Sequence, residues 1–322
     1  MKQVGIICGG YSSEYDISVK SATTICTQFP DQYKSNLIHL TKDGWFIEID
    51  DVKIPFDERD FTYELDGGKQ KVDLAIVYIH GDPGENGKIQ GYLEMIDIPY
   101  VNSGPLASAL SFDKWYCNQF LKGFGFNVAE SIYITSPKNR VDGKKISEKL
   151  GLPVFVKPCD SGSSYGISKA KTIDEIESAL DFAFNEGDTV IVEGFLDGVE
   201  VTCGVYRSAN GVQTLPLTEI VTENDFFDFE AKYEGLSDEI TPARISDELT
   251  AEVQRISAEI YALLQCRSIV RIDFMIVNNE PSIIEVNTIP GFSPESIVPK
   301  MIDEAGISVT QMWQEILEVE VL

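Results

Sequence analysis

Several features that mark common protein classes are missing from this sequence. The six cysteines include no C-x-x-C pair, and several lie in apolar runs typical of strands, so we expect buried free thiols in a reducing compartment. No apolar stretch reaches the roughly 18 residues of a membrane span. The opening residues hold one lysine and a short apolar run, so we expect no signal peptide and a cytoplasmic protein.

Basic residues are scarce beside acidic ones, and the formal net charge is −26. A charge of this size argues against nucleic acid or an anionic membrane as the main partner, because both attract basic surfaces. Any anionic substrate must therefore meet a local cluster of cations or a metal ion. The length of 322 residues allows two or three domains with a substantial core.

The first hundred residues alternate between strand-like and helix-like segments. Short apolar runs are followed by stretches with helical spacing, at 3–8, 17–28, 72–79 and 87–98. This alternation predicts a parallel sheet with crossover helices. Polar loops at 9–16 and 80–87 follow strand ends, where open parallel sheets bind their ligands.

The rest of the chain mixes helices and strands. Helices are expected over 106–125 and 172–187, the second with a Thr172–Glu175 capping box and Gly187 at its end. Another helix carries apolar residues at steps of four and three: Leu249, Val253, Ile256, Ile260 and Leu263. Strands are expected at 152–158, 166–171, 189–196, 268–277 and 281–287. The last two predict an antiparallel hairpin with a three-residue loop, "NNE".

Four polar side chains are candidates for one face of that hairpin. Because side chains alternate along a strand, Arg271 and Asp273 share one face, and Glu285 and Asn287 share a face of the partner strand. Suitable pairing unites three oxygen ligands carrying two charges, a set that suits Mg²⁺ or Mn²⁺. The alternative is a solvent-exposed face with an ordinary cross-strand ion pair.

Two polar loops are candidates for phosphate contacts. "KPCDSGSSYG" (157–166) joins two strands, and its small residues let backbone amides approach an anion beside Lys157. "FFDFEAKY" (226–233) has the composition of a loop that closes over a site, bringing Lys232 and Tyr233 to it. The alternatives are a flexible turn and an ordered aromatic surface loop.

The two loops near the N-terminus each hold a candidate polar group. Glu14 lies just beyond the first strand, where its carboxylate could hold an ammonium group. The alternative is that Glu14 complements the macrodipole of the following helix. His80 stands at a strand end, whereas His39 occupies a strand position and is expected to be structural.

The motifs are specific when taken in order. The chain resembles the D-alanine–D-alanine ligase family at 9–22, 80–94, 103–114, 152–169, 230–233, 271–274 and 285–301. The resemblance implies an α/β ATP-grasp fold in three parts. These are an N-terminal preATP-grasp parallel-sheet domain (1–104), a central ATP-grasp subdomain (105–188) and a C-terminal ATP-grasp subdomain with the metal and substrate site (189–322).

The resemblance also implies the reaction ATP + 2 D-alanine → ADP + phosphate + D-alanyl-D-alanine, for peptidoglycan, through a D-alanyl phosphate. Two Mg²⁺ (or Mn²⁺) ions would be bound by Asp273, Glu285 and Asn287. Phosphate groups would meet Lys114, Lys157 and Lys232. The adenine hinge would be Glu193, Gly194, Phe195 and Leu196, with Glu200 on the ribose.

Substrate contacts are implied in the same way. Glu14 would hold the first ammonium group, and Arg271 with the Gly291 amide would stabilise the oxyanion. A hydrogen-bonded link would join Glu14, Ser163 and Tyr233. His80 would lie near the first substrate, Ser296 would meet the second carboxylate, and Ile297 would line that subsite. A homodimer with no nucleic-acid or membrane partner is expected.

The chain departs from the family pattern at a few positions, namely Tyr15, Asn86, Tyr165, Phe227 and Phe229. None of them removes a proposed metal, phosphate or oxyanion group. Alternatives in the same fold are a ligase that takes D-lactate or D-serine second, and another ATP-grasp carboxylate–amine ligase. A nucleotide-binding regulatory protein without turnover is a third. The retained "EAKY" and the Glu14 and Ser296 motifs favour D-alanine.

Overall fold

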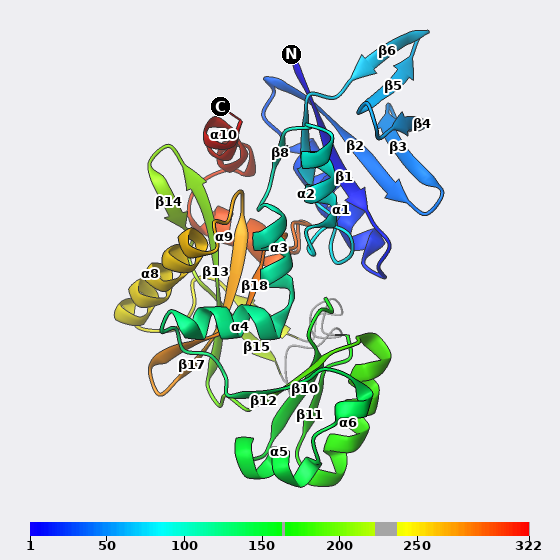
Figure 1. The fold of residues 1–322 in the computed structure, drawn as a ribbon. Helices are drawn as coiled ribbons and strands as arrows, with labels where there is room; N and C mark the ends of the chain where they lie inside the picture. Colours follow the sequence, from blue (N-terminus) through cyan, green and yellow to red (C-terminus); the bar gives the residue numbers. More distant parts are fainter. Residues whose placement is uncertain (163–164, 223–236, 322) are drawn as a thin grey trace.

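A computed structural model describes residues 1–162, 165–222 and 237–321 (Figure 1). The N-terminal part is an eight-stranded sheet of order β6-β5-β4-β3-β2-β1-β7-β8. Its parallel half confirms the predicted alternation: β1 (Lys2–Gly9), β2 (Tyr33–Thr41), β7 (Leu74–Val77) and β8 (Tyr100–Val101). The associated helices are α1 (Tyr15–Thr27) and α2 (Lys88–Met95).

The other half of this sheet is antiparallel, which the sequence analysis did not predict. It consists of β3 (Gly44–Ile49), β4 (Val52–Asp57), β5 (Thr62–Leu65) and β6 (Gly68–Lys71). Short turns explain the direction. Asp50-Asp51 and Asp66-Gly67 all have positive φ, as tight hairpin turns between adjacent strands require. These strands extend the sheet beyond β2, on the side opposite β7 and β8.

The central part is a four-stranded antiparallel sheet of order β11-β10-β12-β9. Its strands are β9 (Ser131–Ile134), β10 (Val154–Pro158), β11 (Ser168–Ala170) and β12 (Val190–Gly194). The short η1 (Pro137–Asn139) precedes α5 (Gly143–Leu150), and α5 and α6 (Ile173–Glu186) pack against the sheet. At the start of α6 the Thr172 hydroxyl accepts from the Glu175 amide, as predicted, but the Glu175 carboxylate accepts from Lys171 N instead of Thr172 N.

The C-terminal sheet has the order β16-β15-β13-β17-β18, with β14 added to β13. Its strands are β13 (Val199–Ser208), β14 (Gly211–Thr214), β15 (Thr218–Thr222), β16 (Ser237–Ile240), β17 (Val270–Val277) and β18 (Glu280–Asn287). The β17–β18 hairpin is confirmed, but its loop is two residues, not three. Asn278 and Asn279 both have positive φ, and Glu280 already pairs with Val277.

Helices connect these parts. α3 (Pro105–Phe112) and α4 (Lys114–Gly123) lie along the C-terminal sheet, as does the predicted apolar helix α8 (Asp247–Leu263). The last helices, α9 (Ile297–Glu304) and α10 (Val309–Glu320), share one apolar core with the N-terminal sheet. The six cysteines are free thiols, and five of them are buried. Within the described ranges, none of the helices is long and apolar enough to cross a membrane.

Candidate active site

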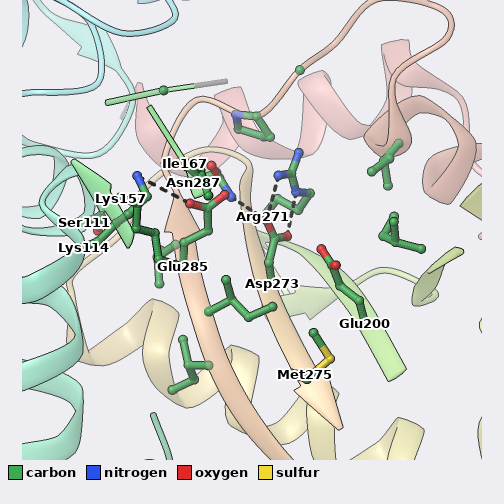
Figure 2. Close-up of a pocket in the computed structure, with 18 of the residues that line it drawn as sticks. Ser111, Lys114, Lys157, Ile167, Glu200, Arg271, Asp273, Met275, Glu285 and Asn287 are labelled. Carbon is green, nitrogen blue, oxygen red and sulfur yellow. Dashed lines mark hydrogen bonds and ion pairs between the residues drawn. The ribbon is translucent and has the colours of Figure 1, made fainter. Parts of the chain in front are cut away.

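A cavity of about 750 Å³ lies where the three parts meet. Its walls come from the loops after β1 and β7, the start of α4, strands β10 and β12, the β17–β18 hairpin and the loop before α9. Figure 2 shows the hairpin side of this cavity, with Lys114, Lys157 and Glu285 on one side of Asn287 and Arg271 on the other. The loops that follow the parallel strands, predicted from the sequence to bind ligands, form one wall.

The hairpin brings its four polar residues together. Arg271 pairs with Asn287 and Asp273 pairs with Glu285, with a bulge directly after Asp273. The Arg271 guanidinium donates to both Asp273 oxygens at 2.8 Å, and Asn287 Nδ2 donates at 3.0 Å. Asp273 is only 7% exposed and borders the cavity, so this face is not the solvent-exposed alternative.

A buried hydroxyl that the sequence analysis missed supports the same carboxylate. Thr202 Oγ1 donates to Asp273 Oδ1 at 2.5 Å from the neighbouring strand β13. Cross-strand pairing places these two residues opposite one another, which only the strand order reveals.

Two lysines lie on the opposite wall of the cavity. Lys157, on β10, forms a 2.5 Å ion pair with Glu193, whose other oxygen accepts from Asn118 Nδ2. Burial alone would lower the pKa of Lys157, but the Glu193 carboxylate and its hydrogen bond raise the pKa above the ordinary value. Lys114 Nζ donates to Ser161 O at 2.8 Å and lies 3.8 Å from Glu285 Oε2. Lys157 is therefore charged, and Lys114 stands next to the hairpin acid Glu285.

The hinge residues, at the end of β12 and directly after it, border the cavity. The cavity wall includes all four predicted adenine-hinge residues and Glu200: Glu193, Gly194, Phe195, Leu196 and Glu200. The rings of Phe155 and Phe195 lie 6.1 Å apart, and Lys169 Nζ stands 4.1 Å above the Phe195 centroid. Aromatic walls suit a planar heteroaromatic ring.

Glu14 is buried at the N-cap of α1, with its carboxylate beside two glycines. A Cβ added at Gly81 or Gly162 would stand 2.9 Å or 2.7 Å from Glu14 Oε2. A side chain at either position would therefore displace this carboxylate. The Glu14 side chain makes no capping bond to α1, although its position at the N-cap also fits the macrodipole alternative.

Glu85 is a second acid in this region that the sequence analysis missed. Its Oε2 accepts from Gly81 N at 2.8 Å, and the residue borders the cavity. Burial, followed by the nearby Glu14 charge, raises the pKa of Glu85 to about 8. The signal was present in the polar loop 80–87, but nothing local indicated that its acid would meet Glu14.

His80 is buried at the end of β7 and borders the same cavity. Its Nε2 lies 3.2 Å from Ser21 Oγ, a contact that ties the histidine to α1. Burial lowers the pKa of His80 to about 4, so the imidazole is neutral near pH 7. The other histidine, His39, contacts Glu48 and Cys8 within the N-terminal sheet, as its strand position predicted.

The loop before α9 holds the remaining described candidates. Gly291, Ser296 and Ile297 all border the cavity. Ser296 Oγ accepts from Ser293 N at 3.0 Å, and it lies 3.0 Å from the position that a Gly291 Cβ would take. Ser163, Lys232 and Tyr233 lie outside the described residues, as do two of the departures, Phe227 and Phe229.

The described departures lie at the edges of the site. Asn86 Nδ2 donates to Asp82 Oδ1 at 2.5 Å, inside the loop after β7. The Tyr15 ring packs against Gly9, where an added Cβ would meet it at 2.6 Å. Tyr165 N donates to Gly162 O in the small-residue loop. Neither Tyr15, Asn86 nor Tyr165 borders the cavity.

This fold and this cavity define an ATP-grasp enzyme, with its cavity bounded by two antiparallel sheets. Family models agree along nearly the whole chain: "D-ala D-ala ligase N-terminus" matches residues 3–103, and "D-ala D-ala ligase C-terminus" matches residues 120–318. The chain belongs to the D-alanine–D-alanine ligase family.

Individual relatives agree with the family models. A D-alanine–D-alanine ligase of Azobacteroides pseudotrichonymphae is 43% identical, and the match covers 99% of both chains. Among solved structures, D-alanyl-alanine synthetase A of Vibrio cholerae superposes with a TM-score of 0.88 at 28% identity, over 99% of this chain and 98% of that one. The VanG D-Ala:D-Ser ligase of Enterococcus faecalis has a TM-score of 0.87 at 29% identity, over 99% of both chains.

Proposed function

We propose that the chain joins two D-alanines to D-alanyl-D-alanine for peptidoglycan, using ATP and releasing ADP and phosphate. The observation that carries the proposal is the single cavity, which unites two different sets of groups. One wall holds the lysines and the aromatic hinge that suit a nucleotide. The other holds Glu14, Arg271 and Gly291, which suit an amino acid and its carbonyl.

We infer that two Mg²⁺ or Mn²⁺ ions bind at Asp273, Glu285 and Asn287. The donor chemistry fits, because two carboxylates and an amide oxygen are hard ligands. Asn287 donates through Nδ2 to Asp273, which leaves its Oδ1 available to a cation. No group of three His, Cys, Asp or Glu side chains gathers within the described ranges, so nucleotide oxygens and water must complete the set. When bound, the ions neutralise the phosphate oxygens.

The proposed reaction depends on positioning. A carboxylate does not react with an amine near neutral pH, so transfer of the γ-phosphoryl group first makes a D-alanyl phosphate. Lys114 and Lys157 hold the ATP phosphates, and Lys232 holds the transferred one. The hinge Glu193–Leu196 and Glu200 hold adenine and ribose. The amine of the second D-alanine then attacks the acyl carbon, and phosphate leaves.

The amino-acid side of the cavity has a separate set of roles. Glu14 binds the ammonium group of the first D-alanine, beside a neutral His80. Arg271 and the Gly291 amide stabilise the oxyanion of the tetrahedral intermediate. Ser296 binds the second carboxylate, with Ile297 lining that subsite. We further infer that Ser163 and Tyr233 link to Glu14 through hydrogen bonds.

D-Serine is the alternative second substrate, and it has one specific observation in its favour. The VanG structure, named as a D-Ala:D-Ser ligase, superposes as well as the ligases named for D-alanine. The curated relatives at 42–43% identity are all named for D-alanine, which supports the first proposal. One hydroxyl needs only a small change of pocket, so the fold alone does not discriminate.

The decisive experiment measures phosphate release with D-alanine alone, and then with D-lactate or D-serine added, across pH. We expect full release with D-alanine alone and a product with the mass of D-alanyl-D-alanine. A mixed product of higher mass under equal concentrations would favour the alternative substrate. A rate of phosphate release that is the same with and without D-amino acids would contradict the proposal.

Two wider expectations accompany this function. We propose a homodimer in the cytoplasm, where ATP is available and where buried free thiols such as Cys8 and Cys203 stay reduced. Sedimentation of the full chain tests the oligomeric state, and a monomer at micromolar concentration would contradict it.

A further inference from the structure

The turn that carries Gly291 is held by the N-terminal sheet. The Tyr78 hydroxyl, at the end of β7, donates to Pro290 O at 2.9 Å across 212 positions of sequence. The Phe292 amide donates to Ser21 Oγ of α1 at 3.1 Å, across 271 positions. These two bonds lie on either side of Gly291, and both partners come from outside the ATP-grasp sheets.

The two bonds control both peptide planes at Gly291. Pro290 C=O and Gly291 N–H belong to one planar trans unit, so they point in opposite directions. Because Tyr78 holds the carbonyl toward the N-terminal core, the Gly291 N–H faces away from that core. Ser21 holds the next unit through Phe292. Within the described part of the chain no group accepts a hydrogen bond from Gly291 N, and Gly291 borders the cavity.

The surroundings of the two hydroxyls are rigid. Tyr78 and Ser21 are both fully buried. The Tyr78 ring packs against Phe292 and Trp313, with centroids 5.9 Å and 6.4 Å away. Ser21 Oγ also contacts His80 Nε2 at 3.2 Å. Burial raises the pKa of Tyr78 well above its ordinary value, so the phenol remains a donor throughout the working pH range.

We propose that Tyr78 and Ser21 are positioning residues for the Gly291 amide, aiming it at the oxyanion of the reaction. The hydrogen bond from Tyr78 also polarises the shared peptide unit, which strengthens the Gly291 N–H as a donor. The N-terminal sheet thereby contributes to bond formation through the backbone, in addition to Glu14. This inference rests on the proposed function and assigns a task to residues that make no contact with the reacting atoms.

The test is Tyr78→Phe in the full chain, with Tyr63→Phe as the matched control. Tyr63 is also buried in the N-terminal core, and its hydroxyl donates a 2.9 Å bond to Gln3, away from the cavity. Both variants lose one hydrogen bond of equal length, so we expect similar small decreases in melting temperature. We expect only Tyr78→Phe to lower kcat, on the order of ten-fold, with KM for ATP unchanged.

A second measurement separates positioning from folding. A phosphinate analogue of the dipeptide presents a tetrahedral oxyanion, and its affinity should fall in Tyr78→Phe by about the same factor as kcat. Affinity for ADP should stay at the wild-type value. Ser21→Ala should likewise lower the affinity for the phosphinate and leave the affinity for ADP unchanged.

Three outcomes would overturn the inference. The first is an unchanged kcat in Tyr78→Phe. The second is an equal decrease of kcat in Tyr63→Phe. The third is a loss of ADP affinity in Tyr78→Phe together with the loss of phosphinate affinity. Failure of the proposed function looks different, because the wild-type chain itself would then make no dipeptide from D-alanine and ATP.

Discussion

Arg271 and Asp273 form a two-pronged ion pair within a single strand, with the Arg271 guanidinium donating to both Asp273 oxygens at 2.8 Å. Thr202 and Asn287 donate to the same two oxygens, so the carboxylate accepts four hydrogen bonds in a fixed orientation. The pair joins the two halves of the proposed chemistry. Asp273 belongs to the proposed metal set and Arg271 to the proposed oxyanion set, so a substitution at either residue should disturb the position of the other.

The two parallel hydrogen bonds from Arg271 to Asp273 predict the effect of Arg271→Lys. Lysine retains the charge but offers a point donor in place of two parallel N–H groups, so Asp273 loses its fixed orientation. We expect kcat to fall about 100-fold, and the chain to stay folded because lysine keeps a cation beside the buried carboxylate. Steady-state kinetics and thermal unfolding measure both. Arg255→Lys on the exposed face of α8 is the control, and an equal loss there would contradict the prediction.

Thr202→Val keeps the branched shape and removes the hydroxyl that holds Asp273 Oδ1. We expect the Mg²⁺ concentration for half-maximal activity to rise about ten-fold, because groups that orient a metal ligand affect metal affinity by this amount. Titration of Mg²⁺ at fixed ATP, with Mn²⁺ binding as a direct measure, tests this. The control is Thr218→Val on the neighbouring strand β15. It removes the hydrogen bond between Thr218 and Thr241 and should leave the Mg²⁺ dependence unchanged. A shift of equal size in both variants would point to general loosening of the sheet.

Glu285→Ala removes one of the two carboxylates of the proposed metal set. We expect ATP-dependent phosphate release to be nearly abolished, because the metal would lose a charged ligand and Lys114 would lose its neighbour at 3.8 Å. The control is Glu280→Ala, an exposed acid at the other end of the same strand. Near wild-type turnover in Glu285→Ala would contradict the proposed role of Glu285 as a metal ligand.

The raised pKa of Glu85 predicts that the stability of the folded chain depends on pH. The pKa of Glu85 rises from 4.5 to about 8 in the folded chain, through burial and then the Glu14 charge, with Glu285 adding to it and Lys114 opposing it. Between these values the folded state keeps a proton that the unfolded chain has released, so stability falls as pH rises through this window. Below pH 4.5 the acid is neutral in both states and has no such effect.

Glu85→Gln removes this titration. We expect its melting temperature relative to wild type to increase from pH 5 to pH 8, and then to level off. Differential scanning calorimetry across this range measures the difference. A constant or decreasing difference would show that the pKa of Glu85 is not raised.

Local pattern was sufficient for much of this fold. The four-and-three spacing from Leu249 to Leu263 predicted α8, and strand alternation placed Arg271 beside Asp273. Turn geometry was less predictable. The hairpin at Asn278 and the β3–β4 and β5–β6 hairpins depend on two-residue turns with positive φ, which asparagine and aspartate permit but do not demand.

The sequence by itself determined the residue types available to the proposed site, because the proposed metal, phosphate and ammonium chemistry restricts them to acids, amides and lysines. Only the tertiary structure decided which groups support them. Glu85 beside Glu14, Thr202 beside Asp273 and Tyr78 against Pro290 are contacts between segments that no local period relates. They arise because separate sheets and helices pack around one cavity, and such packing is set by the whole chain at once.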